Sequence, residues 1–171
     1  MPMSRGAFDD VPLTTLFPFL SPADVEVLRH AARAVDAARV DGDGDGEGEG
    51  AKWEWALQHA VFPRTQQGTP LILGLDVIER ADMGDQLEFQ LWVVWTGLAQ
   101  LAVEAAVTVA CWCDTDHATH DVDALRLVVG EENSLAGAFQ AGTERLMGWL
   151  ADPGDADYWR ARAGLSARRP R

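Results

Sequence analysis

Apolar and polar residues repeat with two different periods along the chain, and the change of period predicts where helices and strands lie. Apolar side chains recur every three or four residues over residues 21–39 and again over residues 134–151. That spacing places them on one face of an α-helix. In the first segment Ser21 can cap the helix, Pro22 suits its first turn and Asp24 favours its positive end. We therefore expect two amphipathic helices.

Between these helices the period changes to two, which is typical of half-buried β-strands. Alternation predicts strands over residues 53–62, 71–78, 87–95 and 99–113, and a short one over 125–129. The connections between the second, third and fourth strands are too short for parallel crossovers, so we expect an antiparallel meander. A helix is the competing interpretation for residues 53–62 and 99–113. Fifteen residues would also be long for one strand, so a bulge or bend is expected in the latter.

The remaining segments predict how the chain is divided. Residues 1–20 contain three prolines and read as an irregular arm whose apolar side chains dock on the body. Residues 21–165 form a single domain, and residues 166–171 form a basic tail. Residues 41–50, DGDGDGEGEG, alternate glycine with carboxylates, which disfavours helix and strand and predicts a flexible, exposed loop. Residues 114–123 read as a second polar loop.

Together these elements predict an α+β fold. It has an N-terminal helix, an antiparallel meander sheet of four or five strands, and C-terminal helices packed on the sheet. The order of helix, meander and helix resembles bacterial secretion-chaperone-like folds and other small adaptor and immunity proteins. The resemblance lies in the layout of the elements, without a shared motif.

Composition narrows the classes of function. The chain has 171 residues, 47% of them apolar, so it can bury a core. Its net charge is −13, which repels phosphate backbones and argues against nucleic-acid binding unless the protein mimics nucleic acid. A basic protein partner fits this charge better. With two cysteines, no secretory signal and no apolar run of ~20 residues, we expect a cytoplasmic protein that contacts no membrane.

Potential metal ligands are concentrated after the fourth predicted strand. Cys111, Cys113, His117 and His120 supply the thiolate and imidazole groups that zinc prefers. Their spacings are tighter than those typical of structural zinc sites. Both cysteines also continue the apolar row that begins at Leu101, and the histidines could simply bond neighbouring carboxylates. Zinc is the one cofactor that the sequence suggests, and a plain core and loop is the competing interpretation.

The acidic loop over residues 41–50 has a second, more specific interpretation, which is a calcium site. An EF-hand loop beginning at Asp43 would place Asp45, Glu47 and Glu54 at its third, fifth and twelfth positions. Low-complexity acidic sequence meets such a pattern by chance, and no helix clearly follows it.

Tryptophans are concentrated at the end of the third predicted strand. Trp92, Val94 and Trp95 make both faces of that strand apolar, and Trp112 extends the apolar character to its neighbour. Helices on both sides of the sheet would bury all four as core. Otherwise one face carries an aromatic patch that suits a partner surface or a ligand pocket.

No sequence motif points to catalysis. Nucleophile-elbow, phosphate-loop, dinucleotide-binding and zinc-protease motifs do not occur. The hypothesis that fits best is a non-catalytic cytoplasmic binding protein, such as an adaptor, a chaperone or an immunity-like inhibitor. It would use an acidic surface and an aromatic sheet face, and a homodimer is compatible with it. The alternative is a small-molecule-binding or metal-dependent enzyme centred on residues 111–120.

Overall fold

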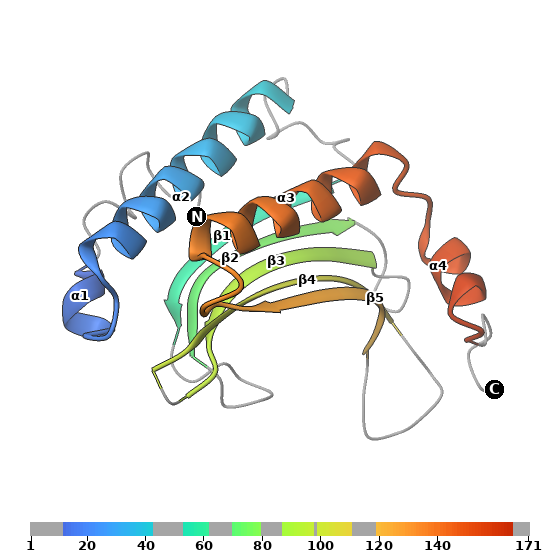
Figure 1. The fold of residues 1–171 in the computed structure, drawn as a ribbon. Helices are drawn as coiled ribbons and strands as arrows, with labels where there is room; N and C mark the ends of the chain where they lie inside the picture. The colour runs from blue at the N-terminus through green and yellow to red at the C-terminus, as the bar shows by residue number, and fades with distance from the viewer. Residues whose placement is uncertain are drawn as a thin grey trace.

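A computed structural model describes residues 12–42, 53–61, 70–79, 87–97, 99–110 and 119–165 (Figure 1). Its helices and strands, in chain order, are α1 (Leu13–Leu16), α2 (Pro22–Gly42), β1 (Trp53–Val61), β2 (Leu71–Glu79), β3 (Leu87–Trp95), β4 (Leu101–Ala110), β5 (Thr119–Val128), α3 (Leu135–Ala151) and α4 (Ala156–Arg162).

The strands form one antiparallel sheet in the order β1-β2-β3-β4-β5. The α+β class and the meander are therefore confirmed, and the helix alternatives for residues 53–62 and 99–113 are wrong within β1 and β4. Figure 1 shows α2 and α3 on the same side of the sheet, with none of the described helices on the other side. The bulge predicted within residues 99–113 is not on β4: at the register shift between Val107 and Thr108 it is β5 that carries the extra residue.

Several boundaries differ from the prediction. The fifth strand begins at Thr119, so the end of the polar loop expected over residues 114–123 is strand. Polar residues are tolerated there because β5 is an edge strand with one face toward solvent. The first long helix continues to Gly42, into the loop expected over residues 41–50. The N-terminal arm contains the single helical turn α1.

Local sequence explains where the long helices begin. The backbone N–H of Asp24 donates to Ser21 Oγ over 3.1 Å, and the Ser21 N–H donates to the Asp24 carboxylate over 3.0 Å. This reciprocal cap satisfies donors that the first turn leaves unpaired. Ser134 caps α3 in a similar way, accepting from the Gly137 N–H over 3.1 Å.

The hydrophobic core lies between the helices and the sheet. Alternate residues of β2, β3 and β4 point into it, as the period of two requires. Its buried members are Leu13, Phe17, Leu20, Val25, Leu28, Ala31 and Ala32 near the N-terminus; Ile72, Leu73, Leu75, Val77, Leu87, Phe89, Leu91, Val93, Leu101, Val103, Ala105, Val107 and Val109 in the sheet; and Leu135, Ala138, Leu146, Trp149, Ala156 and Trp159 near the C-terminus.

The middle of α3 lies unusually close to the sheet. A Cβ atom placed on Gly142 would be 2.7 Å from Leu91 Cδ1 and 3.0 Å from Val103 Cγ1. Nearer its C-terminal end, α3 is held to β5 by Asp123, which accepts from Arg145 Nη2 over 2.8 Å and from Trp149 Nε1 over 3.2 Å. These contacts fix α3 over β3, β4 and β5.

The last helix is joined to the end of β4 by a buried arginine. Arg160 is 1% exposed, and its Nε donates to the carbonyl of Ala110 over 2.9 Å. Its Nη1 lies 2.9 Å from the Asp157 carboxylate. Beside it, the ring of Trp159 packs edge-on against Phe89 at 6.2 Å. The hydrogen bond and the ring contact together hold α4 against the sheet.

The close approach of α3 predicts opposite effects of the same substitution at two glycines of this helix. Gly142→Ala should lower the free energy of unfolding by about 1–3 kcal/mol, because the new methyl group overlaps Leu91 and Val103. Gly148→Ala meets nothing within 4 Å and should raise it by up to about 1 kcal/mol through helix propensity. Urea denaturation of both variants measures the difference. Equal stabilisation by the two alanines would show that α3 has room to move.

Candidate functional site

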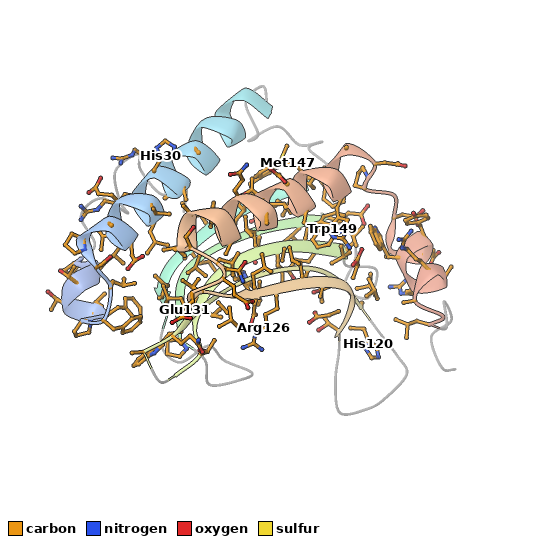
Figure 2. The ribbon with its side chains drawn as sticks, viewed as in Figure 1. His30, His120, Arg126, Glu131, Met147 and Trp149 are labelled. Carbon is orange, nitrogen blue, oxygen red and sulfur yellow. The ribbon has the colours of Figure 1, made fainter. Side chains whose placement is uncertain are left out.

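The predicted zinc ligands are only partly within the described residues. Cys111, Cys113 and His117 lie outside them. His120 is half-buried near the start of β5, opposite Val109. Figure 2 shows His120 at this N-terminal end of β5, on the opposite side of the molecule from His30. Within the described ranges, no three His, Cys, Asp or Glu side chains come together in a way that could hold a metal ion.

The predicted calcium ligands are divided in the same way. Asp43, Asp45 and Glu47 lie outside the described residues. Glu54 is an exposed residue of β1 and is paired with Ile78 of β2. The twelfth position of an EF-hand instead leads into a helix.

The predicted aromatic cluster is distributed over both faces of the sheet. Trp95 lies on the helix side, where its ring packs 5.0 Å from that of Phe19. Trp92 and Val94 lie on the opposite side and form a small apolar cluster with Leu71 and Ala102. Trp112 is outside the described residues.

The face of the sheet opposite α2 and α3 carries most of the polar side chains of the strands. We call it the polar sheet face. Cross-strand register groups its central residues into rows: Ala56, Asp76, Gln90, Ala106 and Ala124 in one; Gln58, Gly74, Trp92, Glu104 and Arg126 in the next; and Glu54, Ile78, Glu88, Thr108 and Asp121 in a third. Among its described residues, carboxylates outnumber the single guanidinium, that of Arg126.

A buried carboxylate lies at the centre of this face. Asp76 is only 1% exposed. Its Oδ1 accepts a hydrogen bond from Trp92 Nε1 over 2.7 Å, and its Oδ2 accepts one from Gln58 Nε2 over 2.5 Å. Hydrogen bonds to an ionised acceptor are the stronger kind, and a buried charge needs them to offset the loss of water. Asp76 therefore ties β1, β2 and β3 together through their side chains.

Gly74 makes room for this arrangement. Trp92 of β3 lies directly opposite Gly74 of β2, and its ring extends over the glycine. A Cβ atom on Gly74 would be 2.8 Å from Trp92 Cδ1. A glycine inside a strand pattern is the sequence signal of such a close approach. Sequence reasoning missed the cluster because alternation within one strand does not show which side chains lie beside Asp76 on the neighbouring strands.

Toward β4 and β5 the polar groups of this face become more exposed. Glu104 Oε1 lies 3.4 Å from Arg126 Nε, and Asp121 accepts from the Thr108 hydroxyl over 2.9 Å. Figure 2 shows Arg126 projecting from β5 on the side away from α3. The face thus combines a fixed, buried centre with charged groups that solvent or a partner can reach.

Comparison of the chain with protein-family models, with curated proteins and with solved structures found no match. Among the described helices, none has the length and apolar character needed to cross a membrane.

The hydrogen bonds from Trp92 and Gln58 to Asp76 predict a stability effect of an isosteric change. Asp76→Asn should lower the free energy of unfolding by about 1–3 kcal/mol, because an amide has a single acceptor oxygen and turns an NH₂ group toward the other donor. Asp152→Asn is the matched control, since Asp152 is exposed at the end of α3 and should change stability by less than about 0.5 kcal/mol. Chemical denaturation measures both. A neutral Asp76→Asn would mean that the carboxylate does not depend on these donors.

Proposed function

We propose that this chain is a non-catalytic binding protein that holds a basic partner protein on the polar sheet face. One observation carries the proposal: Glu54, Glu88, Glu104 and Asp121 share a face that the described helices leave uncovered. They come from four different strands. With strands roughly 4.8 Å apart, carboxylates on β1 and β5 are separated by about 19 Å. That span suits the surface of a folded partner better than a single small ion.

The charge of the whole chain supports a basic partner. A net charge of −13 attracts cationic surfaces over a distance and repels phosphates. Electrostatic complementarity of this kind raises the association rate and selects the partner. Trp92, half-buried among these carboxylates, offers an apolar contact at their centre.

The state of Asp76 supports binding over catalysis at this face. A general base must be able to take up a proton from a substrate. Asp76 is 1% exposed, so its oxygens are hidden from a substrate, and they accept hydrogen bonds from Trp92 and Gln58. We assign it a role in holding the face rigid for a partner.

Charge reversal on this face should abolish partner capture. We expect immobilised native protein to retain a stoichiometric basic protein from a lysate of its native host at low salt and to release it at high salt. The double variant Glu54→Lys/Glu88→Lys should retain roughly tenfold less, because like charges now oppose each other across the interface. Quantitative mass spectrometry of the eluates measures the ratio.

The matched control changes the net charge by the same amount elsewhere. Glu131 and Glu132 are exposed in the turn between β5 and α3, so Glu131→Lys/Glu132→Lys should leave capture within about twofold of the native level. Equal loss in both variants would point to net charge alone and would contradict a specific role of the polar sheet face.

A further inference from the structure

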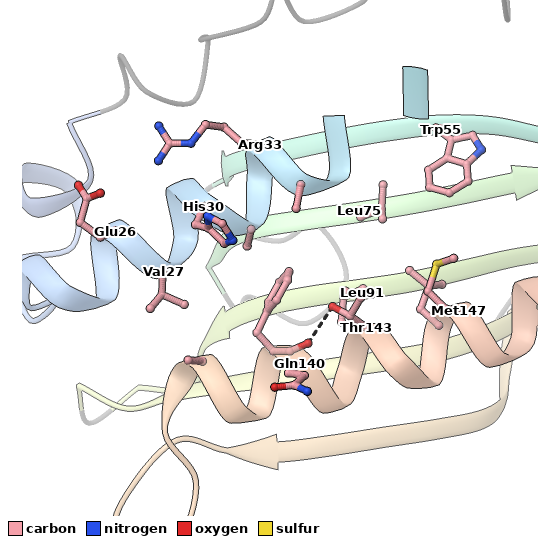
Figure 3. Close-up of a pocket in the computed structure, with 15 residues that line it drawn as sticks. Glu26, Val27, His30, Arg33, Trp55, Leu75, Leu91, Gln140, Thr143 and Met147 are labelled. Atoms are coloured by element: carbon pink, nitrogen blue, oxygen red, sulfur yellow. Dashed lines mark hydrogen bonds between the residues drawn. The ribbon is translucent and has the colours of Figure 1, made fainter. Parts of the chain in front are cut away.

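A cleft lies on the opposite side of the sheet, between the two long helices. It has a volume of about 690 Å³. Its walls are the facing sides of α2 and α3, and Leu75, Leu91 and Trp55 lie beneath them. Figure 3 shows Val27 and His30 toward one end of the cleft and Trp55 and Met147 toward the other. The cleft is therefore elongated along the helices.

The lining is mostly apolar, and the formally charged side chains that reach it are those of Glu26 and Arg33. Figure 3 shows that the charged ends of Glu26 and Arg33 point away from α3. The hydroxyl of Thr143 already donates to the carbonyl of Phe139 over 2.8 Å. Gln140 donates to Glu144 over 3.0 Å. Polar atoms of a ligand would therefore find few partners along the walls of the cleft.

His30 is the exception. It lines the cleft, is exposed, and forms no hydrogen bond or ion pair with another described residue. A neutral imidazole can donate through one nitrogen and accept through the other. One hydrogen-bonding group of a ligand can thus be satisfied at this end, while the rest of the ligand meets carbon and sulfur.

The size of the cleft decides between a small molecule and a protein segment. Ligand pockets typically measure about 300–1,000 Å³. The cleft lies within this range. A stable dimer instead buries roughly 800 Å² on each side, which calls for an extended surface and not for a single cleft between two helices.

The geometry points to a binding site for an uncharged, elongated and mostly apolar small molecule in the cleft between α2 and α3, with one hydrogen-bonding group at His30. An uncharged ligand fits because an ionised group against the apolar walls would lose its water without gaining a partner. Met147, 51% exposed at the rim, supplies an adaptable thioether against such a ligand. This site is separate from the polar sheet face and does not depend on the function proposed for it.

Nile red, an uncharged apolar dye, tests the site directly. The native chain should bind one dye molecule, measured by fluorescence titration. Ala34 lines the cleft and is exposed, so Ala34→Arg should place a long charged side chain in it and weaken binding about tenfold or more. Ala151→Arg, at the exposed end of α3 and outside the lining, is the matched control and should bind within about twofold of native.

A second pair of variants separates loss of the site from damage to a helix. Met147→Lys should weaken dye binding as Ala34→Arg does, whereas Met147→Leu should keep it, and thermal unfolding should be unchanged in both. Light scattering at the same concentrations checks self-association. The proposal is overturned if the native chain takes up no dye, if the two cleft variants bind it as tightly as native, or if uptake follows dimer formation.

Discussion

The contact between Gly142 and the middle of the sheet determines how the helices are distributed over it. Without a side chain at this position, α3 lies directly against Leu91 and Val103, and Asp123 holds its other flank to β5. One helix fixed over the central strands cannot also cover β1 and β2. The strands β1 and β2 are covered by α2 instead. The sheet is wider than either helix, and the cleft is the space that remains between α2 and α3.

The two faces of the sheet differ in how their buried side chains are stabilised. Toward the helices, nearly every side chain is apolar, so burial needs no polar partners. On the polar sheet face a carboxylate is buried beside a small apolar cluster, and Asp76 is stabilised there by donors from the strands on either side. The apolar core fixes the fold, and the hydrogen bonds of Asp76 fix the positions of side chains on the polar sheet face.

Much of the fold could be predicted from the sequence because alternation is a local property. The period of two assigned β2 and β3 nearly to their ends, and short connections required antiparallel pairing. The start of β5 was missed because His120, Asp121 and Asp123 resemble loop residues, although an edge strand accommodates them. Neither Asp76 with its donors nor the α2–α3 cleft could be predicted in this way. Both depend on which residues face each other across elements distant in sequence.

The buried arginine of α4 makes the order of synthesis matter. The strands are complete once Val128 has been made, yet the carbonyl of Ala110 receives its guanidinium donor from Arg160, 50 residues further along the chain. At roughly 5–20 residues per second, the stretch of about 30 residues after β5 takes about 2–6 s to produce. During that interval the end of β4 lacks the helix that later covers it. A chain that ended before Arg160 would lack this cover, so the last stretch of the sequence completes the packing at the end of β4.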